Sequence, residues 1–135
     1  MTEEFEVRGI PSYTKEDTWA KVVGDGSVKV GITDYAQKML NEITYVDFPE
    51  IGSTVSQMES FGTVESSKSV SEIYSPISGI VAAINQDLDD DPEIINRDPY
   101  DAGWIIEIKP SNLEDELKNL LSADEYKVLI KEKTS

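Results

Sequence analysis

The sequence predicts a β-dominated α+β domain, in which a sandwich or barrel of strands carries helices near its ends. About six to eight short segments rich in β-branched residues are separated by turn signals. Only the end of the chain changes to a sustained helical period. No linker rich in Pro, Gly or Ser interrupts the 135 residues, so one domain over residues 1–135 is expected.

Turn and capping signals predict the first elements. Residues 1–12 have no clear period and are expected to form an arm. A β-hairpin is predicted over residues 19–32, because Asp25-Gly26 favours a tight turn and alternate residues after it are apolar. Thr33 or Asp34 then caps a short helix, whose apolar face is formed by Tyr35, Ala36, Met39 and Leu40.

Periodicity predicts strands in the middle of the chain and helices at its end. The strands are expected over residues 43–48, 60–65, 70–74, 80–84 and 104–108. The apolar run 80–84 is typical of a buried strand, and the acidic segment 86–103 is expected to be a loop. Capping patterns at Ser111 and Ser122 begin two helices within 112–132, with apolar faces that contain Leu113, Leu117, Leu120, Leu121, Tyr126, Leu129 and Ile130.

Composition excludes several kinds of chemistry. Asp and Glu number 27 and Lys and Arg number 12, which gives a net charge of −15. Such a charge repels nucleic acid and anionic membranes. The chain has no Cys and no His, so disulfides, thiolate and Ser-His-Asp nucleophiles and Cys- or His-bound metals are excluded. These counts favour a carrier or binding module over an enzyme.

The N-terminal segment predicts the cellular location. It carries Glu3, Glu4 and Glu6, whereas a secretory signal begins basic and a transit peptide is rich in Arg and poor in acid. No apolar run approaches the roughly 20 residues that span a bilayer. We therefore expect a cytoplasmic protein, although a mature organellar chain with its presequence removed would have the same pattern. The protein is also expected to be a monomer.

Lys68 lies near the centre of segment 64–72, which is nearly symmetric about Ser67, and its nearest neighbours Ser66, Ser67 and Ser69 are small and polar. The symmetry suits a hairpin whose strands pack Val64 and Val70 inward while the tip stands out. Small neighbours leave the ammonium group accessible, as a covalently modified carrier lysine requires. The spacing alone also allows an exposed lysine without a function.

Other conspicuous residues have structural explanations. The acidic run 87–91 begins like an EF-hand loop, but Pro92 stands where that loop needs Gly, so a solvated loop is expected. The glycines within 24–31 lack the spacing of a dinucleotide-binding loop. Trp19 and Trp104 are expected to pack in the core.

Several motifs, in the right order, resemble the H-protein of the glycine cleavage system, a small lipoyl carrier. The resemblance runs from about Tyr13 to Glu132. The motifs are Val30-Gly31-Ile32-Thr33-Asp34-Tyr35-Ala36-Gln37, Phe61-Gly62-Thr63-Val64-Glu65-Ser66-Ser67-Lys68, Ser75-Pro76-Ile77-Ser78-Gly79, and Asn96-Arg97-Asp98-Pro99-Tyr100 followed by Gly103-Trp104 and Ile108-Lys109-Pro110.

The resemblance implies a barrel-sandwich hybrid with Lys68 at a hairpin tip, joined to lipoic acid through an amide bond. Glu65 and Ser67 form the motif context of that lysine. In the family, a lipoate-attaching enzyme modifies the carrier. The lipoyl arm then shuttles the aminomethyl group of glycine between glycine decarboxylase, a tetrahydrofolate-dependent aminomethyltransferase and dihydrolipoamide dehydrogenase. The carrier itself catalyses nothing.

The chain departs from the family pattern near the cleft that shelters the loaded arm. The family commonly has His-Glu before the tryptophan, where this chain has Asp17-Thr18. The resemblance thus places Thr18 and Met39 where the family has a glutamate and a histidine. Neither side chain balances a protonated amine by charge, so a weakened shelter is expected.

Other functions are compatible with the sequence. The altered cleft allows an H-like lipoate-binding carrier for another pathway, such as sulfur oxidation, or a lipoate relay. An unmodified acidic module that binds a basic partner is the alternative from a different class. A biotin carrier fits less well, because its lysine usually lies between two methionines. Here Lys68 lies between Ser67 and Ser69, where the H-protein family usually has Val and Ala.

Overall fold

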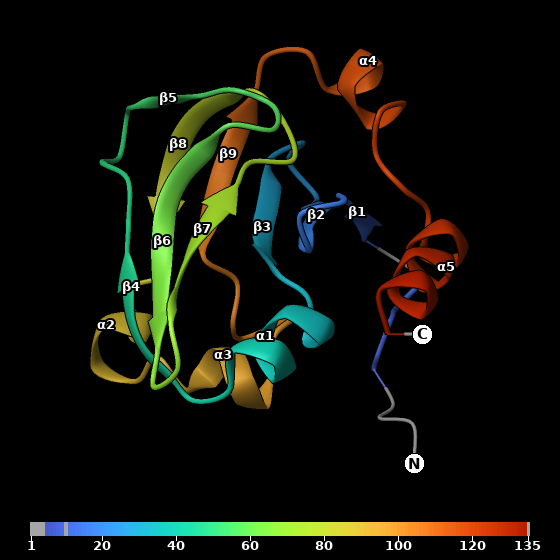
Figure 1. The fold of residues 1–135 in the computed structure, drawn as a ribbon. Helices are drawn as coiled ribbons and strands as arrows, with labels where there is room; N and C mark the ends of the chain where they lie inside the picture. The colour runs from blue at the N-terminus through green and yellow to red at the C-terminus, as the bar shows by residue number, and fades with distance from the viewer. Residues whose placement is uncertain (1–4, 10, 135) are drawn as a thin grey trace.

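The computed structural model describes residues 5–9 and 11–134, and two antiparallel β-sheets dominate it (Figure 1). The larger sheet has the strand order β1-β2-β3-β9-β8-β5, and the smaller sheet has the order β4-β6-β7. The strands are β1 (Ser12–Tyr13), β2 (Thr18–Val22), β3 (Val28–Ile32), β4 (Ile43–Asp47), β5 (Thr54–Val55), β6 (Ser60–Ser66), β7 (Val70–Tyr74), β8 (Gly79–Ile84) and β9 (Ile106–Pro110). The predicted β-dominated α+β class is confirmed.

The main hydrophobic core lies between the two sheets. Strands of both sheets contribute side chains to it from one face, because successive residues of a strand point to opposite faces. Core members from both sheets include Val28, Val30, Val46, Val64, Ile73, Val81 and Ile108. The inner faces of the sheets therefore form one continuous apolar layer, and their outer faces remain available for other contacts.

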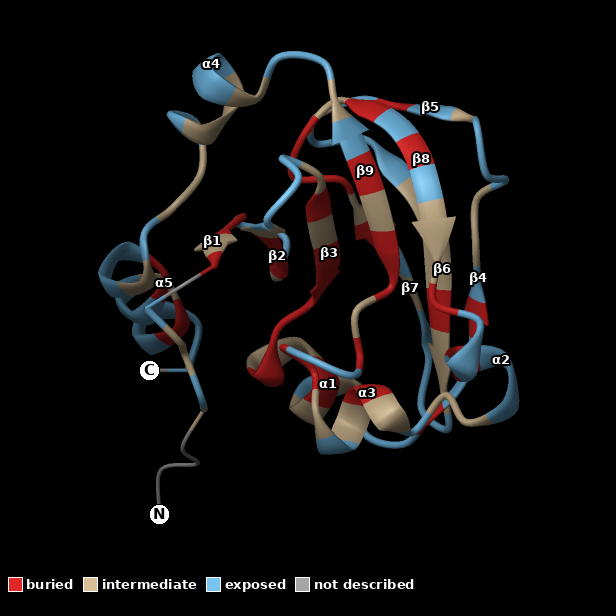
Figure 2. Ribbon diagram, turned by 180° about the vertical axis from the view of Figure 1, so that it is seen from behind, coloured by how far each residue is buried: buried red, intermediate tan, exposed pale blue. Residues whose placement is uncertain are grey.

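Short helices lie at the margins of this sandwich. They are α1 (Asp34–Leu40), α2 (Asp87–Asp90), α3 (Ile94–Arg97), α4 (Leu113–Leu117) and α5 (Ala123–Thr134). The first three gather at one end of the sandwich, and α5 lies beside β1 (Figures 1 and 2). In the described part of the chain, no helix combines the length and the hydropathy needed to cross a membrane.

The structure confirms the first predicted hairpin. For the helix that follows, it confirms one of the two predicted N-cap residues. β2 and β3 pair antiparallel, and Gly26 has a φ of 89° in the turn between them, a conformation that glycine adopts without strain. The hydroxyl of Thr33 accepts a hydrogen bond from the Ala36 N–H at 3.2 Å and caps α1. Asp34 lies inside the first turn of the helix.

Two predictions for residues 80–103 are wrong. Exposure alternates along β8, with Ile80 49% exposed, because only the face toward the smaller sheet is covered (Figure 2). The segment predicted to be a loop contains α2 and α3. Leu88 and Ile95 are fully buried in these helices, so contact with the core stabilises turns too short to be stable alone.

The C-terminal leucine pattern forms a shorter helix than predicted. α4 ends at Leu117, so Leu120 and Leu121 lie in the connection to α5. The second capping pattern is confirmed. Ser122 N–H donates to the Glu125 carboxylate at 2.9 Å, and Glu125 N–H donates to the Ser122 hydroxyl at 3.2 Å.

A second cluster, made largely of aromatic side chains, lies on the outer face of the larger sheet. Trp19 is fully buried there, as predicted, and its indole N–H donates to the carbonyls of Ile32 at 3.0 Å and Pro99 at 3.1 Å. The rings of Tyr13 and Tyr126 stack with centroids 4.6 Å apart. The cluster thus joins the first hairpin to the loop after α3 and to helix α5.

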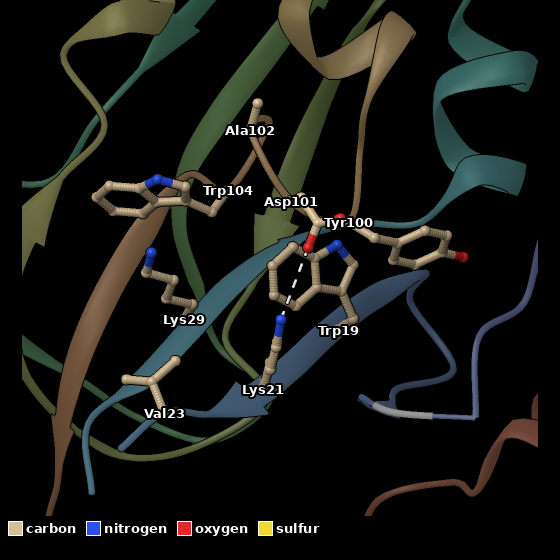
Figure 3. A pocket seen from close by; sticks show the side chains of 8 residues that line it. All are labelled: Trp19, Lys21, Val23, Lys29, Tyr100, Asp101, Ala102 and Trp104. Carbon is tan, nitrogen blue, oxygen red and sulfur yellow. Dashed lines mark ion pairs between the residues drawn. The ribbon is translucent and has the colours of Figure 1, made fainter. Parts of the chain in front are cut away.

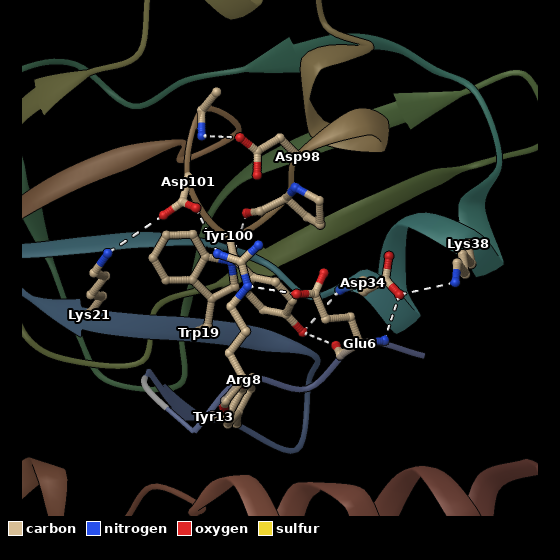
Figure 4. Close-up of polar contacts among 12 residues, drawn as sticks. Glu6, Arg8, Tyr13, Trp19, Lys21, Asp34, Lys38, Asp98, Tyr100 and Asp101 are labelled. Carbon is tan, nitrogen blue, oxygen red and sulfur yellow. Dashed lines mark hydrogen bonds and ion pairs between the residues drawn. The ribbon is translucent and has the colours of Figure 1, made fainter. Parts of the chain in front are cut away.

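Polar contacts hold the N-terminal arm against this cluster (Figure 4). The Tyr100 hydroxyl donates to the Glu6 carbonyl at 2.6 Å, and Glu6 N–H donates to the Asp34 carboxylate at 2.8 Å. Arg8 pairs with Asp101 at 2.7 Å. Burial raises the pKa of Tyr100, so its phenol stays a neutral donor. Residues 1–4 and 10 of the expected arm lie outside the described residues.

Gly31 lies where a side chain would meet Trp19. A Cβ at this position would come 2.6 Å from a carbon of the Trp19 ring, and the ring cannot shift without losing its two hydrogen bonds. We predict that Gly31→Ala lowers the free energy of unfolding by about 2 kcal/mol, as overpacked cores do. Urea unfolding measures this change.

The matched control is Gly24→Ala, which adds the same methyl group where no atom lies within 4 Å. We expect it to leave the urea midpoint nearly unchanged. If both substitutions destabilised the protein equally, the close approach of Trp19 would not be the cause.

Candidate functional site

Lys68 lies at the tip of the hairpin formed by β6 and β7. Ser66 N–H donates to the Ser69 carbonyl at 2.8 Å, so the loop consists of Ser67 and Lys68. The Ser66 hydroxyl accepts the backbone N–H groups of Lys68 at 3.1 Å and Ser69 at 3.0 Å. These bonds stabilise the turn without a residue of positive φ at the tip, which explains the absence of Gly and Asn.

The tip is anchored to the connection between α1 and β4. Ser67 N–H donates to the carbonyl of Glu42 at 2.9 Å. Asn96 holds the two neighbours of Glu42, because its side chain donates to the Asn41 carbonyl at 2.8 Å and accepts the Ile43 N–H at 2.9 Å. The backbone of the tip is therefore braced, although its side chains are exposed.

The two valines beside the tip do not share a face. Val64 is 1% exposed, whereas Val70 is 62% exposed, so the predicted inward packing of Val70 is wrong. The loop of two residues moves the centre of symmetry from Ser67 to the bond between Ser67 and Lys68, and it pairs Val70 with Glu65. Directly paired residues share a face, so Val70 and Glu65 both point away from the core.

A cleft of about 140 Å³, which we call the hairpin cleft, opens between α1, β7 and the turn before β2. Its apolar lining includes Ile32, Leu40 and Val64. Met39 also lines the cleft and is 39% exposed. The Nζ of Lys68 lies 3.5 Å from the carbonyl oxygen of Met39, which brings the lysine to the edge of the cleft.

The carboxylates of Glu16, Asp17 and Glu72 also line the hairpin cleft. Asp17 is already engaged with helix α5, because it accepts the Tyr126 hydroxyl at 2.9 Å and pairs with Lys133 at 3.1 Å. Its negative charge is therefore largely balanced within the protein.

Glu16 and Glu72 form no ion pair with any cation in the described part of the chain. Glu72 accepts a hydrogen bond from the Tyr74 hydroxyl at 3.0 Å. This bond raises the pKa of the Tyr74 phenol, and the charge of Glu16 adds to the effect. The cleft thus combines an apolar lining with two carboxylates that lack a cationic partner.

The expected weakening of the cleft depends on Thr18 and Met39, but only Met39 lines it. Thr18 is 1% exposed, and its hydroxyl is bonded to that of Thr14 at 2.7 Å. The negative charge at the cleft instead belongs to carboxylates at other positions, those of Glu16, Asp17 and Glu72. Two acidic residues directly before Thr18 and one acidic residue four positions after Lys68 are the only features of the sequence that point to these carboxylates.

The Ser66 hydroxyl is predicted to determine the rigidity of the tip. Ser66→Ala removes the acceptor for two backbone N–H groups, at a cost of about 1 kcal/mol in local stability. We expect hydrogen exchange at the amides of Lys68 and Ser69 to become about fivefold faster. Ser67→Ala is the matched control, because Ser67 anchors the tip through its backbone. Equal exchange rates in the two variants would contradict this role.

Comparison with known proteins identifies close relatives. The profile of the family described as Glycine cleavage H-protein matches residues 11–133. A relative from Pyrococcus abyssi, described as a probable glycine cleavage system H protein, is 53% identical over 95% of each chain. One from Geobacillus kaustophilus, described as a glycine cleavage system H protein, is 50% identical over 89% of this chain and 93% of its own.

A solved structure agrees with the fold. The crystal structure of a glycine cleavage system H protein from Mycobacterium marinum matches with a TM-score of 0.81 at 40% identity. The match covers 89% of this chain and 95% of that chain. The barrel-sandwich hybrid expected from the sequence is thereby confirmed.

Proposed function

The chain belongs to the glycine cleavage H-protein family, in which the protein is a carrier component and not an enzyme, and we propose that it carries lipoic acid on Lys68. The carboxyl carbon of lipoate, activated by a lipoate-attaching enzyme, bonds to Nζ with net loss of water. The positive charge of the lysine is lost in this step. The observation that carries the proposal is an exposed lysine on a braced two-residue tip.

The residues around Lys68 on the hairpin are accessible to a modifying enzyme. Ser67 and Ser69 leave space on both sides of Lys68. Glu65 lies on the outer face of the smaller sheet between the exposed side chains of Tyr45 and Val70. A modifying enzyme can therefore contact a carboxylate and two apolar groups close to the lysine, while the brace at Ser67 holds the tip in place.

The proposed partners are glycine decarboxylase, a tetrahydrofolate-dependent aminomethyltransferase and dihydrolipoamide dehydrogenase. When bound, the lipoyl group supplies a disulfide that takes up the aminomethyl group. The protein contributes a fixed attachment point and an acidic surface, with a net charge of −15. This charge attracts basic patches on the partners in a salt-dependent way. We propose that the chain acts as a monomer and a single domain, in the cytoplasm.

The hairpin cleft suits an apolar arm that ends in a protonated amine. Ile32, Leu40 and Val64 offer apolar contact, and Glu16 and Glu72 offer negative charge without a competing cation among the described residues. A nearby opposite charge favours the protonated amine. The altered cleft is the reason for considering a different lipoate-dependent pathway, and the presence of carboxylates in this cleft supports glycine cleavage.

We predict that expression in a host able to lipoylate gives an intact mass increased by one lipoyl group, located by peptide mapping at Lys68. Lys68→Arg abolishes the increment, because the guanidinium group is a poor nucleophile that stays protonated. Lys109→Arg, which changes another exposed lysine, retains it. An unmodified protein beside a lipoylated control carrier would favour the acidic interaction module instead.

We predict that Glu16→Gln together with Glu72→Gln shortens the lifetime of the aminomethyl-loaded carrier about fivefold. The reason is the loss of roughly 1 kcal/mol of charge stabilisation at the amine. Intact-mass measurements without the partner enzymes follow the loss of the aminomethyl group.

The double variant Glu50→Gln and Glu114→Gln makes the same change in net charge at exposed positions outside the cleft. It is expected to keep the original lifetime. Equal shortening in both double variants would mean that net charge, and not the cleft, protects the amine.

A further inference from the structure

The N-terminal arm is held at Glu6 through the backbone of that residue. The Glu6 carbonyl accepts the Tyr100 hydroxyl at 2.6 Å, and the Glu6 N–H donates to the Asp34 carboxylate at 2.8 Å (Figure 4). Phe5 adds an edge-to-face contact with Tyr35, with ring centroids 4.9 Å apart. The arm therefore docks on the first turn of α1, the helix that lines the hairpin cleft. The carrier function proposed above does not account for this contact.

Tyr100 gives the arm a rigid docking point. Trp19 is fully buried beside it, with ring centroids 6.2 Å apart, whereas Trp104, which the sequence predicts in the core, is only half-buried (Figure 3). The Tyr100 hydroxyl also accepts the N–H of Asp34 at 3.3 Å. One buried phenol thus binds both the arm and the start of α1.

Asp34 is the residue at which the arm meets α1. Its buried carboxylate accepts the Glu6 N–H, the Gln37 side chain at 2.8 Å and the Lys38 ammonium at 3.1 Å. Burial alone would raise the pKa of Asp34, but these hydrogen bonds outweigh it and hold the pKa below its ordinary value. Because a buried carboxylate that loses a donor is destabilised, release of the arm disturbs the contact between Asp34 and Gln37.

Gln37 connects Asp34 to Asn96. Its buried side chain donates to Asp34 and accepts a hydrogen bond from the Asn96 amide at 2.8 Å. Asn96 in turn binds the residues on either side of Glu42, whose carbonyl anchors the hairpin tip. Hydrogen bonds in such a chain polarise one another. A line of hydrogen bonds, with one backbone step at Glu42, thus runs from the arm to the tip.

The helix between these contacts depends on them for its position. α1 has seven residues, and isolated helices shorter than about 12 residues are marginal in water. The arm and Tyr100 hold its beginning, and Asn96 holds its end. A segment with few contacts opens more readily than the core, so the arm is the part of this assembly that is released first.

We propose that docking of the N-terminal arm positions the hairpin tip, with Asp34, Gln37 and Asn96 as the positioning residues that connect the two. With the arm docked, the Glu42 carbonyl is fixed and keeps its hydrogen bond from Ser67. With the arm released, this anchor loosens. The value of the device for a carried group rests on the proposed lipoyl function. The connection itself is measurable on the unmodified protein, so either proposal can fail without the other.

Hydrogen exchange at two tip amides of the unmodified, full-length protein tests the proposal. Phe5→Ala weakens docking of the arm, and we expect about threefold faster exchange of the Ser67 amide, because one aromatic pair is lost. The Ser66 amide is the internal reference, since it is bonded to Ser69 within the loop. Glu6→Ala is the matched control, because Glu6 docks through its backbone. It should leave both amides unchanged.

A double-mutant cycle tests the connecting residues. Gln37→Met keeps the length of the side chain but removes both hydrogen bonds, so about fivefold faster exchange at Ser67 is expected. Adding Phe5→Ala should cause no further change, because the connection is already broken. Phe5 is only partly buried, so Phe5→Ala decides the coupling even where Gln37→Met does not fold.

Three results would overturn the proposal. The first is equal exchange at Ser67 in Phe5→Ala and Glu6→Ala, which would mean that docking of the arm does not reach the tip. The second is equal acceleration of the Ser66 and Ser67 amides, which would indicate general loosening of the hairpin. The third is multiplication of the two effects in the double variant, which would mean that Gln37 does not connect the arm to the tip.

Discussion

The buried indole of Trp19 is the constraint on which the rest of the structure depends. Its N–H group joins the end of β3, at Ile32, to the loop after α3, at Pro99. That loop follows directly from Asn96, whose amide fixes the connection between α1 and β4. The same connection receives the hydrogen bond from the hairpin tip. A contact in the aromatic cluster is thus linked, step by step, to the position of Lys68.

Rigidity and charge are distributed in a way that suits a carrier. The hairpin tip is braced through backbone groups, so its exposed side chains are not needed to hold the turn, apart from the hydroxyl of Ser66. Its lysine borders a cleft with an apolar lining and two carboxylates that have no cationic partner among the described residues. On the proposed function, an arm attached to this lysine begins at the edge of the cleft and is also open to solvent.

Local signals predicted the features that depend on few residues. Gly26 and the alternation after it define the first hairpin, and Ser122 with Glu125 defines the start of α5, because both patterns act within a few positions. The exposure of Val70 was not predictable in this way, since it depends on the register that the Ser66 hydroxyl helps to fix. Nor were α2 and α3, which depend on burial of Leu88 and Ile95. The cleft carboxylates come together only through folding of segments far apart in the sequence.

Asp17 belongs to the hairpin cleft, yet its counter-ion comes from the far end of the chain. Lys133 forms this ion pair from the last turn of α5, where helices fray most readily. Tyr126, nearer the start of the same helix, donates its hydroxyl hydrogen bond to the same carboxylate. Unwinding of that final turn would withdraw a positive charge and leave a third uncompensated carboxylate in the cleft. The charge of the cleft therefore depends on an ion pair with a helix turn more than one hundred residues away in the sequence.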